Sequence, residues 1–202
     1  MTSTSFINGT RRLFDAAFIR VLVRRLHAAH GDVRIDLQLT DRKGPILQGD
    51  GGYSRKGPAA GNASYYYSLT RLETTGQIAA SGGSQSVSGW SWMDHEFGSS
   101  QLKENQVGWD WFSLQLDDQR ELMLYRLRRA DGSADPVSSG TLIDREGRGQ
   151  HLSIGDFTLE PTSYWTSPTS KARYPQRWHL TIPSQQLSLE LVPLMAEQEL
   201  ST

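Results

Sequence analysis

The sequence of 202 residues contains no cysteine, which excludes disulfide frameworks, thiolate metal sites and cysteine nucleophiles. It contains no run of 18 apolar residues, so no transmembrane helix is predicted. The first ten residues lack the order of charged and then apolar residues that marks a signal peptide. Neither sign of charge is in excess, because 21 basic and 22 acidic residues give a net charge of −1. Nucleic-acid binding needs a basic face, so we expect no nucleic-acid partner.

Short apolar runs, many of them alternating with polar residues and separated by turn-forming residues, predict an all-β protein. Hydrophobic residues make up only 37% of the chain, and glycine is frequent at 19 residues. The Gly- and Pro-rich stretch 44–62 is predicted to be a loop. The expected strands are 33–39, 64–72, 76–80, 85–93, 107–116, 121–129, 139–143, 150–154, 157–161, 177–182 and 187–192.

One helix is predicted, over residues 11–29, where the sequence reads RRLFDAAFIRVLVRRLHAA. Its apolar arc is wide and its polar positions are mostly arginine, which is compatible with contact to a membrane surface. Packing of the same helix against a sheet is the alternative. His27 and His30 lie three residues apart, but no third ligand accompanies them, so we expect neither a metal site nor a cofactor.

The stretch 87–132 is the most informative part of the chain, because it holds four of the six tryptophans around the triplet Asp94-His95-Glu96. Side chains of a strand point alternately to its two faces. An extended conformation therefore places one set of side chains on one face: Trp90, Trp92, Asp94 and Glu96. It places a second set on the other face: Ser91, Met93, His95 and Phe97. Two carboxylates beside two indoles suggest a functional site, and a hydrogen-bonded structural network is the alternative.

Five stretches of the sequence resemble the carotenoid 1,2-hydratase family, the AttH-like, lipocalin-like group also called predicted secreted hydrolases. They are GDGGYSRKG, GNASYYYSLTRL, VSGWSWMDHEFGSS, GWDWFSLQLDDQRELMLYRLRRADGSADPVSSGTLID and YWTSPTSKARYPQRWHL. The resemblance covers about residues 31–200 and implies two consecutive lipocalin-like β-barrels. It implies the end of a first barrel over 31–93 and most of a second over 94–202, with residues 1–30 outside it. The chain then resembles a fragment or trimmed variant of a periplasmic or secreted protein.

The resemblance implies binding of a hydrophobic isoprenoid or lipid-like ligand and hydration of a C=C bond. A non-catalytic lipid-binding module and a pericyclase-like cyclase are the alternatives within the same family. Asp94 and His95 match the Asp-His of hydratase-type members, whereas Phe97 stands where those members have tryptophan. Tyr125 matches their tyrosine on a following strand, and Leu127 occupies the place of a nearby acid.

Hydration of an alkene begins with protonation by a strong acid. A carboxylic acid stays protonated when an apolar wall raises its pKa, and indole faces stabilise the resulting cation. Asp94 is the first choice for this acid, with His95 as a relay. The candidate catalytic residues are Asp94, His95, Glu96 and Tyr125. The candidate ligand-binding residues are Tyr65, Tyr67, Trp90, Trp92, Phe97, Trp109 and Trp111. Trp165 and Trp178 are expected in the core.

Overall fold

The computed structural model describes residues 25–59, 61–98 and 102–199, and the predicted all-β class is confirmed there. The helices of this part are two 3-10 turns, η1 (Ile154–Asp156) and η2 (Pro183–Gln185). The first strands are β1 (Arg25–His30), β2 (Val33–Asp41), β3 (Ile46–Leu47), β4 (Tyr53–Arg55), β5 (Ala63–Ala80) and β6 (Gly83–Phe97). The later strands are β7 (Gln106–Gln115), β8 (Glu121–Arg129), β9 (Ser139–Ile143), β10 (Gly149–Ser153), β11 (Thr158–Thr166), β12 (Arg173–Ile182) and β13 (Leu187–Leu191).

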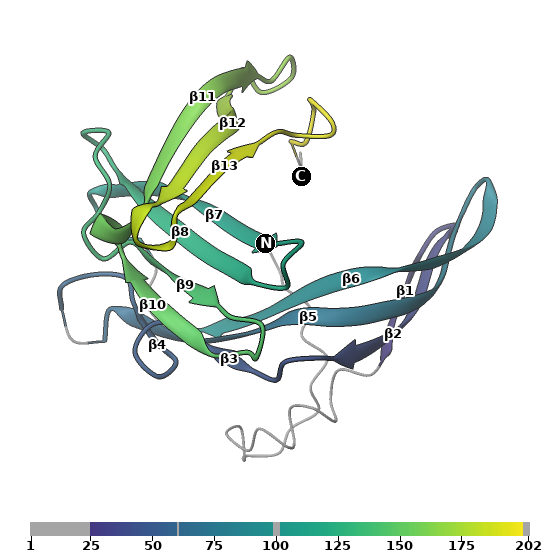
Figure 1. The fold of residues 1–202 in the computed structure, drawn as a ribbon. Coiled ribbons are helices and arrows are strands. Elements are labelled where there is room, and N and C mark those ends of the chain that lie inside the picture. The colour runs from purple at the N-terminus through teal and green to yellow at the C-terminus, as the bar shows by residue number, and fades with distance from the viewer. Residues whose placement is uncertain (1–24, 60, 99–101, 200–202) are drawn as a thin grey trace.

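The strands form three antiparallel sheets (Figure 1). In the first, β5 pairs with β2, β3, β4 and β6, and β1 lies outside β2. The second has the order β10-β9-β8-β7, and the third has the order β11-β12-β13. The sheets curl around one another, as expected for a lipocalin-like barrel, while the strands β1, β2, β5 and β6 extend together beyond the rest of the molecule (Figure 1).

The hairpin of β5 and β6 is the longest feature of the first sheet, with 18 and 15 residues in its two strands. The pairing shifts between Leu69 and Leu72, so β5 carries one extra residue there, as in a β-bulge. Because of this shift, Leu69 and Leu72 lie on the same face, where they pack with Leu39. The opposite face of β5 carries Tyr66, which packs against side chains of β8.

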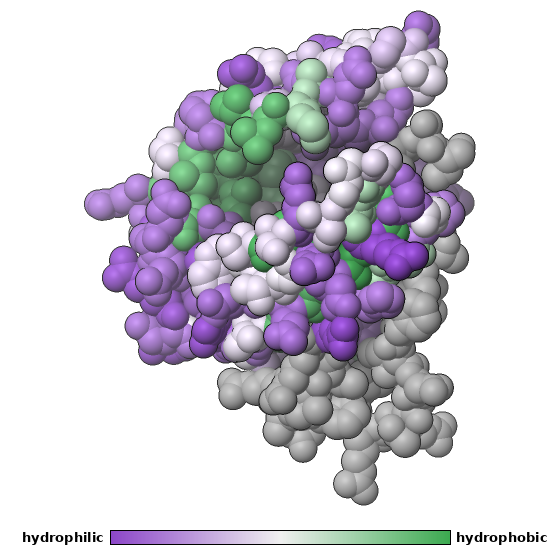
Figure 2. Space-filling view, turned by 90° about the vertical axis from the view of Figure 1, so that its right-hand side faces the viewer, coloured by the Kyte–Doolittle hydropathy of each residue, from purple (hydrophilic) through white to green (hydrophobic). Residues whose placement is uncertain are grey.

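The main core lies between the second and third sheets and contains leucine, isoleucine and aromatic side chains. Hydrophobic side chains also line a hollow on one face of the molecule (Figure 2). Trp178 belongs to it and is only 7% exposed, as the sequence predicted. The same prediction was wrong for Trp165, which is partly exposed and stacks on Tyr174 with ring centroids 5.9 Å apart. Pro161 of β11 pairs with Trp178, but the pairing of β11 shifts on both sides of Ser163. Side chains beyond these shifts, including Trp165, therefore do not keep the alternation between buried and exposed faces that the sequence prediction assumed.

A buried ion cluster fastens the first sheet to the second. The Glu121 carboxylate of β8 is fully buried, and Lys43 Nζ lies 2.7 Å from it. Arg71 of β5 donates to the same carboxylate. Lys43 also donates to the carbonyl oxygens of Gln119 and Asp144, each at 2.6 Å. The loop after β2, the strand β5 and the strand β8 are far apart in sequence, and they therefore meet at one carboxylate.

The sequence predictions of a helix over 11–29 and of a loop over 44–62 were wrong in part. Residues 25–29 of the predicted helix belong to β1, whose six residues all pair with β2. Gly31, with a φ of +59°, allows the tight turn between these strands, so cross-strand pairing overrides the helical spacing. Residues 11–24 and the proposed membrane-surface contact through them lie outside the described residues. The predicted loop 44–62 contains the short strands β3 and β4, which both pair with β5.

Within the described part of the chain, no helix is long and apolar enough to span a bilayer. The boundary predicted between Met93 and Asp94 falls inside β6, which pairs with β5 on both sides of that point. The division into two lipocalin-like domains therefore stays a prediction.

Candidate functional site

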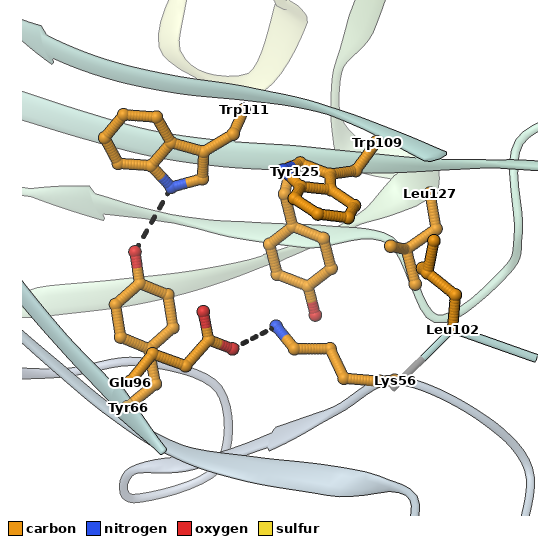
Figure 3. Close-up of a pocket in the computed structure, with 8 residues that line it drawn as sticks. All are labelled: Lys56, Tyr66, Glu96, Leu102, Trp109, Trp111, Tyr125 and Leu127. Atoms are coloured by element: carbon orange, nitrogen blue, oxygen red, sulfur yellow. Dashed lines mark hydrogen bonds and ion pairs between the residues drawn. The ribbon is translucent and has the colours of Figure 1, made fainter. Parts of the chain in front are cut away.

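A cavity of about 390 Å³ lies between the β5–β6 hairpin and the strands β7 and β8 (Figure 3). Aromatic and leucine side chains form most of its wall, and one lysine and one glutamate are its charged groups. Its lining residues are Lys56, Tyr66, Glu96, Leu102, Trp109, Trp111, Tyr125 and Leu127. The cavity therefore combines an apolar wall with a single charged pair, an arrangement typical of small-molecule sites.

Tyr66 and Trp111 connect the two walls of this cavity. The indole Nε1 of Trp111 on β7 donates a hydrogen bond of 3.2 Å to the Tyr66 hydroxyl on β5 (Figure 3). Tyr66 is only 3% exposed, and burial raises the pKa of its hydroxyl strongly, with the nearby Asp94 charge acting in the same direction. Tyr66 consequently remains a neutral phenol at physiological pH and can act as a hydrogen-bond donor.

The charged pair consists of Lys56, which follows β4, and Glu96 of β6. Lys56 Nζ lies 2.8 Å from Glu96 Oε1 and 3.0 Å from the Ser54 hydroxyl. It also lies 4.0 Å from the centroid of the Tyr125 ring, within range of a cation–π interaction. The Ser64 hydroxyl donates to the same oxygen of Glu96. Hydrogen bonds from two elements thus fix the carboxylate at the cavity wall.

Asp94 lies two residues before Glu96 and on the same face of β6, as the alternation predicted. Its Oδ1 accepts hydrogen bonds from the Ser68 hydroxyl and, at 2.9 Å, from Trp92 Nε1. Gln48 Nε2 in turn donates a hydrogen bond of 2.9 Å to Ser68 Oγ. Burial of the carboxyl raises the pKa of Asp94, while hydrogen bonds from Ser68, Trp92 and Tyr66 oppose the rise. Asp94 retains exposed surface and reaches the cavity wall through Tyr66.

The opposite face of the hairpin carries His95 and Phe97 together with two of the tyrosines. His95 Nδ1 lies 3.0 Å from the Tyr67 hydroxyl, and burial lowers the pKa of His95. Phe97 stacks on Tyr65 with ring centroids 5.6 Å apart. These four candidate site residues therefore form a cluster of their own, separated by the sheet from the cavity.

The remaining candidates divide between the cavity and its surroundings. Trp109, Trp111, Glu96 and Tyr125 line the cavity, whereas Trp90 is 51% exposed and contacts the Arg71 guanidinium, 5.3 Å from its ring centroid.

Trp92 packs beside the cavity, against the cluster that contains Tyr66, Tyr125 and Leu127. The Tyr125 hydroxyl contacts the carbonyl oxygens of Arg55 and Val137 at 3.0 and 3.2 Å. The Ser139 hydroxyl donates to it at 3.0 Å, so Tyr125 presents its ring, rather than its hydroxyl, to the cavity.

Sequence reasoning missed four lining residues: Lys56, Tyr66, Leu102 and Leu127. Alternation along the Tyr-rich strand placed Tyr66 opposite Tyr65 and Tyr67, but it did not show which face lines a cavity. Lys56 follows a short strand in a Gly-rich stretch, where no periodicity marks its direction. Among the described residues, no group of three or more His, Asp or Glu side chains is arranged to hold a metal ion.

Comparison with known proteins supplies the family. The AttH-like family matches residues 19–202. A crystal structure assigned to the AttH group, from Nitrosomonas europaea, is 34% identical with a TM-score of 0.81, and covers 88% of this chain and 54% of that one. Kievitone hydratase from Nectria haematococca has a similar fold at 17% identity and a TM-score of 0.59, over 79% of this chain and 49% of that one. No curated protein sequence gives a significant match.

The chain spans about half the length of both solved relatives, 54% and 49% respectively. The family match extends over most of the chain. The relative at 34% identity is assigned to the same group, and the antiparallel sheets fit its fold. The chain belongs to the AttH-like family and has a lipocalin-like fold.

Proposed function

We propose that this protein binds a hydrophobic, isoprenoid or lipid-like small molecule in the cavity between the β5–β6 hairpin and β7–β8. The observation that carries the proposal is the aromatic wall formed by Trp109, Trp111, Tyr66 and Tyr125 around a space of about 390 Å³. Burial of apolar ligand surface against such a wall provides affinity, and the Glu96 carboxylate at the wall orients the polar end of the ligand. By family resemblance, we also propose a periplasmic or secreted location and two lipocalin-like domains.

The binding proposal is tested by fluorescence titration with farnesol, an acyclic isoprenoid alcohol. Trp109 lines the cavity and is 58% exposed, so Trp109→Ala removes binding surface with little effect on folding. We expect this variant to bind farnesol at least ~10-fold more weakly, the loss of about 1.4 kcal/mol. Trp90→Ala is the matched control, because Trp90 is 51% exposed and lies outside the cavity. Equal affinities for both variants would refute the proposed site.

A second proposed function is hydration of a C=C bond, with Asp94 as the general acid. It is supported by the Asp94 carboxyl, whose pKa is raised by its partial removal from water, and by the similar fold of a hydratase. The protonated acid would transfer its proton to an alkene carbon, directly or through Tyr66. Indole faces would stabilise the tertiary cation, and water would add to it and return a proton to the Asp94 carboxylate. A non-catalytic binding module and a pericyclase-like cyclase are the alternatives.

Asp94→Asn tests this second function because it keeps the shape of the side chain and removes the acid. We expect hydration of an acyclic isoprenoid, followed by mass spectrometry, to slow by at least ~100-fold, the usual scale of general-acid catalysis. Affinity for the isoprenoid should change little. Asp32→Asn, in the turn between β1 and β2, is the control. Product formation by Asp94→Asn at the wild-type rate would exclude Asp94 as the acid.

A further inference from the structure

The ammonium group of Lys56 is fully engaged inside the protein. A lysine ammonium has three hydrogen-bond donors. At Lys56 they meet the Glu96 carboxylate at 2.8 Å, the Ser54 hydroxyl at 3.0 Å and the face of the Tyr125 ring, whose centroid lies 4.0 Å away. The lysine side chain is only 18% exposed. A ligand can therefore gain a direct bond from this ammonium only by displacing a partner that is already in place.

The Glu96 carboxylate has acceptor capacity to spare. The contacts that the described residues make to it, from Lys56 and Ser64, both involve Oε1. The side chain is 39% exposed, and it faces the cavity (Figure 3). An ionised carboxylate only accepts hydrogen bonds, so Oε2 suits a ligand group that donates one, such as a hydroxyl.

The charge of the site also favours a neutral polar group on the ligand. Lys56 and Glu96 neutralise each other. A ligand carboxylate in this cavity would bring an unpaired negative charge beside the Glu96 carboxylate, and burying an unpaired charge is costly. A neutral polar group carries no such cost, whether it is a hydroxyl, which also donates to Oε2, or an ester, which has no donor.

We propose that the Lys56–Glu96 pair makes the cavity selective for ligands with a neutral polar end, such as a hydroxyl or an ester, over ligands that end in a carboxylate. This inference rests on the proposed binding function and specifies its ligand class. It distinguishes isoprenoid alcohols, phenols and esters from free fatty acids. Glu96 is the specificity-determining residue, because its charge occupies Lys56 and repels an anion.

The test compares three probes of nearly equal size, farnesol, methyl farnesoate and farnesoic acid, by fluorescence titration at neutral pH. Wild-type protein should bind the alcohol and the ester at least ~10-fold more tightly than the acid. Glu96→Gln frees Lys56 to pair with an anion, so its affinity for farnesoic acid should rise at least ~10-fold while its affinity for the ester stays within about 3-fold. Glu73→Gln is the matched control, because Glu73 pairs with Arg42 on the same sheet, away from the cavity.

The outcomes separate the two proposals. If the wild type binds the acid as tightly as the ester, the selectivity is refuted, whereas the binding function stands. If none of the three probes binds, the binding function fails and the selectivity fails with it. Should Glu96→Gln fold poorly by thermal melting, Lys56→Met provides the reciprocal measurement: it leaves Glu96 unpaired and should increase the affinity for farnesylamine, a cation. An unchanged affinity for the amine would also contradict the proposal.

Discussion

Asp94 experiences opposing influences on its pKa, and burial is the larger of them. The folded state therefore holds the proton to a higher pH than the unfolded chain does. Between the unfolded and the folded pKa the native state binds more protons, so the free energy of unfolding falls as the pH rises through this window. The contribution of Asp94 to the free energy of unfolding is fully present below its pKa in the unfolded chain. It is lost as the pH rises through its pKa in the folded protein.

Asp94→Asn removes this titration and should flatten the pH dependence. We expect the free energy of unfolding of the wild type, relative to the variant, to decrease as the pH rises from about 4 towards 7, since ordinary aspartates titrate near 4. Urea unfolding at a series of pH values measures the difference. A difference that is constant over this range would show that Asp94 has an ordinary pKa in the folded protein.

Ser68 and Trp92 both donate to Oδ1 of Asp94, so a proton on this carboxyl is left to Oδ2. Because the Ser68 hydrogen bond lowers the pKa of Asp94, Ser68→Ala should raise it further. Trp92 donates to the titrating group, so its fluorescence should report the shift in a pH titration. Ser88→Ala, on an exposed part of β6, is the control. A midpoint unaltered by Ser68→Ala would show that Ser68 does not position the acid.

The sequence could predict part of this site because the information is local. Alternation along β6 correctly placed Asp94 and Glu96 on one face and His95 on the other. It could not predict Lys56, which meets Glu96 only because β4 and β6 both pair with β5. That contact depends on sheet register over forty residues, and no spacing within either segment reveals it.

At the scale of elements, β5 was predicted as two shorter strands, 64–72 and 76–80, and observed as one strand of 18 residues. The residues of the predicted gap, 73–75, pair with β2 on one side and with β6 on the other, so the strand runs through it. Gly76, with a φ of +155°, follows directly. A Cβ at Gly76 would lie only 2.1 Å from the Asp36 carbonyl oxygen of β2, so glycine permits the close approach of these two strands.

The ion cluster at Glu121 joins the elements of two sheets, and its removal should destabilise the whole molecule. Glu121→Gln leaves the buried Lys43 and Arg71, which are 4% and 11% exposed, without their anion. We expect a loss of about 3 to 5 kcal/mol in the free energy of unfolding, the usual effect of breaking a buried ion pair. Denaturant unfolding measures it. Glu146→Gln is the control, because its pair with Arg148 is exposed and should contribute less than about 1 kcal/mol.

A loss below about 1 kcal/mol for Glu121→Gln, equal to that of the control, would mean that the two sheets associate through apolar packing alone. The cluster at Tyr66, Met123 and Leu127 would then be the main connection between them.

At the scale of the whole molecule, the all-β class and most strands were predictable because alternation and turn residues act locally. The arrangement of three sheets was not, since it depends on packing between distant segments. Within the described residues, β6 pairs with β5 along one side. Its other side therefore offers a long row of backbone donors and acceptors, and such edges favour association between chains.

We predict that this chain associates in solution through the edge of β6. Lysine on an edge strand opposes such pairing, so the double variant Ser86→Lys/Ser88→Lys, at two exposed positions of β6, should shift the protein towards monomer in sedimentation velocity. Thr169→Lys/Gly155→Lys adds the same charge at exposed positions away from this edge; a side chain at Gly155 meets no atom within 4 Å. The control should associate like the wild type, because its β6 edge is unaltered. Monomeric wild-type protein, or equal association of both double variants, would show that this edge is not the contact.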